Sequence, residues 1–154
     1  MRIGVLALQG NFREHLAMLA HCGVQGSEVR TVEELAATDG LIIPGGESTT
    51  VGKLMARYGL DAAIRERVAR GMPVFGTCMG LILIAREIEG SDQPCLGLMD
   101  VTVRRNAFGR QVDSFECDLE VAGFAPPPVR AVFIRAPYIT RVGENVEVLA
   151  TFEG

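Results

Sequence analysis

In Pro73-Val74-Phe75-Gly76-Thr77-Cys78-Met79-Gly80, an apolar strand pattern runs into a cysteine held between two glycines. The mostly apolar run that follows, Leu81 to Glu87, predicts a helix. A nucleophile flanked by glycines between a strand and a helix is typical of the sharp turn at the carboxyl end of a parallel strand. This stretch therefore predicts an α/β fold and singles out the Cys78 thiol.

Upstream of this turn, strand and helix patterns alternate along the chain. Strands are expected to end at 6–8, to lie around 28–31 and to cover 41–43; helices are expected from 12 to about 22 with Asn11 as cap, from 32 to 35, and from 49 to 70 with a break at Gly59. Such alternation predicts a mostly parallel central sheet with helices on both faces.

The carboxyl-terminal half has a different character. Strands are expected at 101–103, 114–121, 129–134 and 146–152, so this half is predicted to be β-rich and partly antiparallel. No linker, low-complexity run or internal repeat divides the 154 residues. We therefore expect residues 1–154 to form a single domain.

Composition excludes several classes of protein. With 48% hydrophobic and 22% charged residues, the chain resembles globular proteins and not disordered ones. Its net charge of −4 and dispersed arginines argue against nucleic acid or an anionic membrane as partner. No apolar run approaches about 18 residues and no secretion signal is recognised, so a cytoplasmic location is expected.

The cysteines favour a thiol function over metal or disulfide chemistry. The sequence has four cysteines, no Cys-x-x-Cys pair and two histidines, so we expect no metal site and no cofactor. Cys78 would lie at a helix amino terminus, which favours the thiolate, and the N–H of Met79 could stabilise an oxyanion. The alternative is an inert cysteine whose glycines serve packing. Cys22, Cys95 and Cys117 have no comparable surroundings.

A second glycine segment, residues 44–50, also follows a predicted buried strand. Its glycines can present free N–H groups at the sheet edge where open α/β sheets bind ligands, and Ser48 or Thr49 can cap the next helix. A simple capped loop is the alternative. A P-loop is excluded, because five residues separate Gly46 from Gly52 where four are required, and Leu54 follows Lys53.

Two arginine segments are weaker signals. The pair Arg104-Arg105 follows a predicted strand and could bind a carboxylate through two N–H groups, although solvated turn arginines are the commoner explanation. Phe133-Ile134-Arg135-Ala136-Pro137 is an apolar strand that ends in an arginine.

Taken together, these segments resemble the class I (triad) glutamine amidotransferases, whose sheet is flavodoxin-like, and within them the glutaminase subunits of pyridoxal 5′-phosphate synthase. The matching segments are 6–10, 13–15, 44–49, 76–80, 105–111 with 114–116, and 133–137.

The resemblance implies hydrolysis of L-glutamine to L-glutamate and ammonia through a cysteine thioester, with ammonia delivered to a synthase subunit for vitamin B6 biosynthesis. It implies Cys78 as the nucleophile and Gly46 with Met79 as the oxyanion site. The residues that it implies for glutamine binding are Gly46, Glu47, Ser48, Arg105, Ile134 and Arg135.

One family feature has no counterpart in these 154 residues. The family takes its general base from a His-Pro-Glu segment near the carboxyl end, whereas His15 and His21 both fall in the first predicted helix. We expect a sequence cut short before that segment, and therefore weak or no turnover by the chain as given. A naturally shortened, inactive binding subunit of the synthase, a base such as His15, and another kind of cysteine hydrolase remain alternatives.

Overall fold

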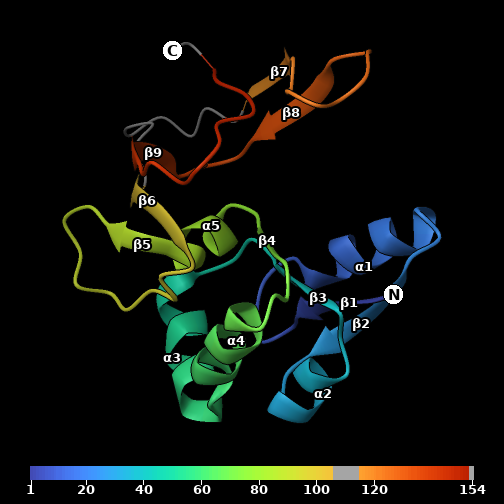
Figure 1. Ribbon diagram of the computed structural model, residues 1–154, viewed down its shortest axis with the longest axis vertical. Coiled ribbons are helices and arrows are strands. Elements are labelled where there is room, and N and C mark those ends of the chain that lie inside the picture. Colours follow the sequence, from blue (N-terminus) through green and yellow to red (C-terminus); the bar gives the residue numbers. More distant parts are fainter. Residues whose placement is uncertain (106–114, 153–154) are drawn as a thin grey trace.

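A four-stranded parallel sheet organises the amino-terminal half of the computed structural model, which describes residues 1–105 and 115–152. The strand order is β2-β1-β3-β4, so the chain winds outward in both directions from β1 and β3 (Figure 1). The strands are β1 (Arg2–Leu6), β2 (Gln25–Val29), β3 (Gly40–Ile43) and β4 (Val74–Gly76). Parallel pairing brings the carboxyl ends of β3 and β4 to the same edge, because Ile43 is in register with Gly76.

Helices cover both faces of this sheet. Added side-chain atoms at Gly26 in β2 would meet Leu16 and Leu19 of α1, whereas Val29 of β2 lies in the main buried cluster with Leu35 of α2. Positions 26 and 29 point to opposite faces of a strand, so α1 and α2 lie on opposite sides, as Figure 1 also shows. The helices are α1 (Phe12–His21), α2 (Val32–Ala36), α3 (Ser48–Tyr58), α4 (Leu60–Ala69) and α5 (Met79–Ile84).

The main core lies on one side of the sheet. Its buried cluster draws on β1 to β3 and on α2 to α5, with Leu60, Ile64 and Leu83 among its fully buried members. Helix α1, in contrast, has no buried residue. The structure thus leaves α1 as an exposed cover on the second face.

The predicted break between two helices at Gly59 is confirmed. Gly59 has φ +70° and is both the C-cap of α3 and the N-cap of α4. This left-handed conformation suits glycine and ends a helix without steric cost.

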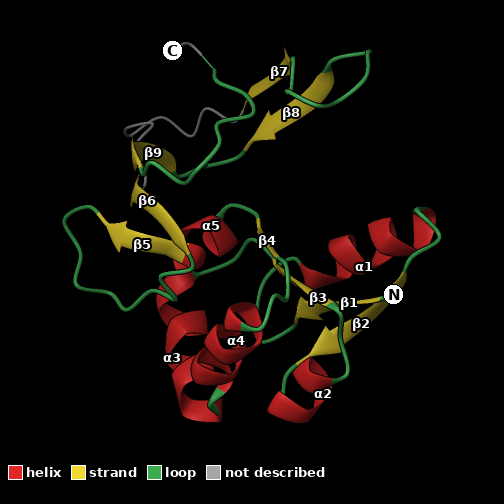
Figure 2. Cartoon of the chain, viewed as in Figure 1, coloured by secondary structure: helices red, strands yellow, loops and turns green. Residues whose placement is uncertain are grey.

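The carboxyl-terminal half is rich in strands, as predicted, and forms two smaller sheets within the described residues (Figure 2). β6 pairs in parallel with β5 and antiparallel with β9, while β7 and β8 form an antiparallel pair. These strands are β5 (Ala85–Ile88), β6 (Met99–Arg104), β7 (Phe115–Leu119), β8 (Val129–Phe133) and β9 (Tyr138–Val142).

Two predictions about this half are wrong, and one strand was not predicted. The helix expected over 81–87 ends at Ile84, because Ala85 to Ile88 pair with β6 as β5. The strand expected at 146–152 is absent, and Val146 packs as a loop residue against the second buried cluster. Residues 138–142, which were not assigned to a strand, form β9.

Other boundaries differ by a few residues. The strand expected around 28–31 occupies Gln25–Val29, and the strand expected to reach Leu8 ends at Leu6. None of the helices in the described part of the chain is long and apolar enough to span a bilayer.

Candidate functional site

Cys78 lies on a strained turn between β4 and α5. Its backbone adopts φ +49° and ψ −105°, a conformation that non-glycine residues rarely take and that tends to occur at functional sites. The turn is anchored on both sides, because the N–H of Thr77 donates to the Ile43 carbonyl at 3.1 Å and the N–H of Gly80 donates to the Thr77 carbonyl at 2.8 Å. The predicted sharp turn is therefore present, and the Cys78 side chain is exposed on it.

The two glycines of this turn are required by close approaches. A Cβ at Gly80 would lie 1.9 Å from the carbonyl oxygen of Ile43 in β3, and a Cβ at Gly76 would lie 2.7 Å from the carbonyl carbon of Gly80. Without side chains at these positions, α5 can begin directly against the sheet. Its first residues are thereby held beside the end of β3.

The glycine loop that follows β3 lies against this turn. A Cβ added to Gly45 would be 3.6 Å from the Cβ of Cys78. The loop is held from its other side by the segment before α1, because the N–H of Asn11 donates to the Gly45 carbonyl at 3.0 Å and Gln9 Oε1 accepts from the N–H of Glu47 at 2.9 Å. The sequence pattern did not point to this contact of Gln9.

The cap of α3 is Glu47, which corrects the prediction of Ser48 or Thr49. Glu47 accepts from the backbone N–H of Thr50 at 2.8 Å and of Thr49 at 3.3 Å. These hydrogen bonds, led by the one from Thr50, lower the pKa of the Glu47 carboxyl. Ser48 is buried in the first turn instead, where its hydroxyl donates to Gln93 Oε1 at 3.2 Å.

Met79 is the first residue of α5, and its side chain is buried. The first N–H groups of a helix have no partner within the helix, so the Met79 N–H has no intrahelical acceptor. A Cβ at Gly46 would lie 3.3 Å from the Met79 methyl group. The methionine side chain therefore packs beneath the glycine loop, and the two expected oxyanion residues are neighbours.

Arg104 and Arg105 do not act as a pair. Arg104 makes two hydrogen bonds to the Glu89 carboxylate, at 2.7 and 3.0 Å, on the surface. Arg105 instead turns toward the start of α3, where its Nη1 lies 3.5 Å from Ser48 Oγ and 2.8 Å from Gln93 Oε1. The structure thus brings the expected binding residues Ser48 and Arg105 together, with Gln93 as a neighbour that sequence reasoning did not single out.

Ile134 and Arg135 follow β8. The Ile134 side chain is 59% exposed, and Arg135 has φ +43°. Among the described residues, no hydrogen bond or ion pair links either of them to Cys78, to the glycine loop or to Arg105. The part of the predicted arginine–asparagine segment that covers 106–114 lies outside the described residues.

His15 is the histidine nearest to this turn by its contacts. Its Nε2 lies 3.1 Å from the Thr77 hydroxyl, one residue before Cys78. Burial lowers the pKa of His15, and the Glu14 carboxylate opposes this in part, so the neutral ring is favoured. The contact is made to Thr77, so the alternative in which His15 is the base has no direct contact to the thiol to support it.

The remaining cysteines differ from Cys78. Cys95 is half-buried, and burial raises the pKa of its thiol, which disfavours the thiolate. Cys22 follows α1, and Cys117 lies in β7. In the ranges 1–105 and 115–152, no group of three His, Cys, Asp or Glu side chains is arranged to hold a metal ion.

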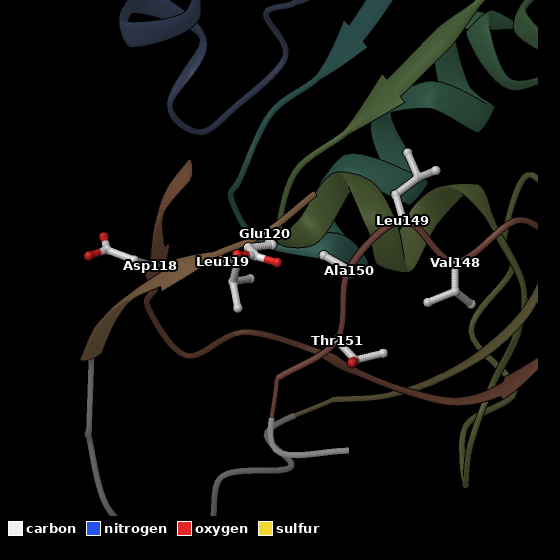
Figure 3. A pocket seen from close by; sticks show the side chains of 7 residues that line it. All are labelled: Asp118, Leu119, Glu120, Val148, Leu149, Ala150 and Thr151. Carbon is white, nitrogen blue, oxygen red and sulfur yellow. The ribbon is translucent and has the colours of Figure 1, made fainter. Parts of the chain in front are cut away.

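The hollow shown in Figure 3 lies elsewhere in the molecule. It has a volume of about 470 Å³ and is formed by the end of β7, at Asp118 to Glu120, and the segment Val148 to Thr151. None of the residues around the Cys78 turn lines it. The candidate site is the Cys78 turn, because strained backbone, a thiol and the amino terminus of α5 coincide there.

Comparison with known proteins shows which family the chain belongs to. The chain is 59% identical to pyridoxal 5′-phosphate synthase subunit PdxT of Carboxydothermus hydrogenoformans, over 97% of this chain and 78% of that protein. It is 59% identical to the PdxT subunit of Moorella thermoacetica, over 99% and 81%. A crystal structure described as a glutamine amidotransferase superposes with a TM-score of 0.92 at 53% identity, over 97% of this chain and 79% of the other. The sequence pattern of the SNO glutamine amidotransferase family matches residues 5–154, and the chain belongs to that family.

Proposed function

We propose that residues 1–154 form one glutamine amidotransferase domain that hydrolyses L-glutamine and supplies the ammonia to a pyridoxal 5′-phosphate synthase subunit. The observation that carries this proposal is the closeness of the Cys78 turn to the glycine loop at Gly45, both at the carboxyl ends of adjacent parallel strands. Ligands bind at this edge in open α/β sheets. The match to the glutamine amidotransferase family supports the choice of substrate, and the high identity to PdxT subunits supports the choice of partner.

The chemistry divides a difficult hydrolysis into two steps. The Cys78 thiolate attacks the carboxamide carbon, the C–N bond breaks, and ammonia leaves with a proton from a general acid. Water then attacks the thioester, releasing glutamate and the thiolate. Each tetrahedral intermediate carries a negative oxygen, for which the N–H groups of Gly46 and Met79 are the proposed donors.

The remaining proposed substrate contacts come from the start of α3, from Arg105 and from the end of β8. Glu47 and Ser48 lie at the start of α3, where Arg105 reaches the Ser48 hydroxyl, and the Arg105 guanidinium is the proposed partner of the substrate carboxylate. Ile134 and Arg135 complete the proposed set from the end of β8.

Turnover by these 154 residues alone is expected to be slow. Thioester formation and hydrolysis both need proton transfer, and His15 makes its contact with Thr77. Removal of one member of a catalytic triad lowers kcat by about 10³-fold or more.

The test is glutamate release from L-glutamine in the presence of the synthase subunit, for the native protein and for Cys78→Ala. We expect Cys78→Ala to fall to the uncatalysed background, while Cys22→Ala, at an exposed cysteine after α1, keeps the native rate. Equal rates for native protein and Cys78→Ala would refute the proposal. Binding of glutamine and of the synthase with no release in either protein would favour a non-enzymatic binding subunit.

A further inference from the structure

Gln93 lies where the start of α3 meets Arg105. Its side-chain oxygen Oε1 accepts from Arg105 Nη1 at 2.8 Å, from Thr49 Oγ1 at 3.0 Å and from Ser48 Oγ at 3.2 Å. Three donors from two distant parts of the chain thus converge on one amide oxygen. Gln93 itself belongs to the loop between β5 and β6 and to neither of those parts.

The orientation of the Gln93 amide is determined by Arg105. A guanidinium has donors only, so it can face the amide oxygen but not the amide NH₂ group. Rotation of the amide by half a turn would place two donors 2.8 Å apart. Consistent with this constraint, Nε2 of Gln93 is buried and has no hydrogen-bond partner among the described residues.

Ser91 reinforces the same arrangement. Its hydroxyl lies 3.2 Å from the N–H of Gln93 and 3.2 Å from Nη2 of Arg105. Both terminal nitrogens of Arg105 are therefore held by the loop between β5 and β6. The guanidinium retains further N–H groups, because it carries five donors in total.

We infer that Gln93 is a positioning residue of the glutamine site: it fixes the Arg105 guanidinium and the Ser48 hydroxyl in the orientation in which they receive the substrate. The inference rests on the proposed function, in which Ser48 and Arg105 contact glutamine. Fixing these side chains before the substrate arrives lowers the entropy lost on binding, so Gln93 acts on affinity without touching the substrate.

The first test is a calorimetric titration of L-glutamine into the chain with Cys78→Ala, which prevents turnover. Adding Gln93→Ala should raise Kd by about tenfold or more, because the Arg105 and Ser48 side chains must then be ordered when the ligand binds. Asp92→Ala, at the exposed neighbouring residue of the same loop, should leave Kd unchanged. An unchanged Kd in Gln93→Ala would overturn the inference.

A double variant separates positioning from a general loss of structure. If Gln93 acts through Arg105, Gln93→Ala should add little to the loss caused by Arg105→Ala. Fully additive losses would overturn the inference. The Kd of the chain with Cys78→Ala alone is the reference for both comparisons. If that chain bound no L-glutamine, the proposed function itself would be refuted.

Gln93→Glu provides a second variant that keeps the acceptor. It retains an oxygen for Arg105, Ser48 and Thr49, so the fold should survive, but its negative charge neutralises the guanidinium. We expect weaker binding of L-glutamine and much less effect on the α-amide of L-glutamine, which has no carboxylate. Equal effects on the two ligands would contradict a role through Arg105.

Discussion

The carboxylate of Glu47 stabilises the first turn of α3, because it accepts the N–H groups of Thr49 and Thr50. Glu47→Ala should lower the free energy of unfolding by at most about 1 kcal/mol, the usual cost of losing a helix cap. Since the pKa of Glu47 is lowered in the fold, this contribution is complete above the ordinary carboxyl pKa and is lost as pH falls through the lowered value. Urea unfolding of the native protein and of Glu47→Ala, at a series of acidic pH values, measures this contribution.

Glu66→Ala is the matched control for this prediction. Glu66 is an exposed glutamate on α4 that pairs with Arg70 at 2.6 Å, four residues along the helix. Such exposed pairs contribute about 0.3–0.5 kcal/mol. A Glu47→Ala deficit that did not shrink on acidification would contradict the capping role.

His15 gives a separate pH dependence nearer neutrality. Its pKa is lowered by burial, so the unfolded chain binds the proton more readily than the folded chain. The free energy of unfolding should therefore fall as pH drops from the ordinary histidine pKa through the lowered one. His15→Gln should remove this slope, which lies below the ordinary histidine pKa of about 6.5, whereas His21→Gln, in the last turn of α1, should retain it. If the slope were unchanged in His15→Gln, His15 would not be the source of this pH dependence.

At the level of elements, the junction of α5 with β3 depends on Gly80. Gly80→Ala would place a Cβ 1.9 Å from the Ile43 carbonyl oxygen, so α5 must move away from the sheet. We expect a loss of about 3 kcal/mol or more in the free energy of unfolding. Gly52→Ala is the matched control in α3, because its Cβ would lie 3.9 Å from Leu83 and alanine favours a helix interior by about 1 kcal/mol. Thermal unfolding of the two variants should shift in opposite directions.

Elements with strong local signals were predictable from the sequence. The break at Gly59 follows from glycine's access to positive φ, and the buried strand β3 from its apolar run. The error at 85–88 has a non-local cause, because the apolar run after Gly80 suits a helix until pairing with β6 takes over. β9 was missed because all five of its residues are exposed, so no apolar alternation marks it.

The part of the site that follows from neighbouring strands was also predictable from the sequence, whereas the part that depends on irregular segments was not. Adjacent parallel strands bring the segments after β3 and β4 together, and this explains why Gly45 and Cys78 could be expected to meet. Gln9 and Gln93 lie in irregular segments whose paths depend on tertiary contacts. Their amide oxygens organise the glycine loop and Arg105, yet neither residue belongs to a periodic pattern.

At the scale of the whole molecule, stability is expected to be uneven. β1 and β3 are interior strands of the parallel sheet and border the main buried cluster. β7 and β8 form a separate two-stranded sheet, a unit that is only marginally stable by itself in water. Their shared support is a set of aromatic rings, in which Phe133 stacks on Phe115 at 4.7 Å and lies 5.7 Å from Phe152.

Hydrogen exchange followed by mass spectrometry should resolve this difference. Amides of β1 and β3 should exchange slowest and those of β7 and β8 at least about a hundredfold faster, because local opening of the pair does not require the main core to unfold. Phe133→Ala should remove the remaining protection of β7 and β8 and leave β1 and β3 as in the native protein. Phe124 lies in the segment that connects β7 to β8, and its ring is 67% exposed. Phe124→Ala should therefore leave exchange unchanged both in β7 and β8 and in β1 and β3. Loss of protection in β1 and β3 on Phe133→Ala would mean that the hairpin and the parallel sheet unfold as one cooperative unit.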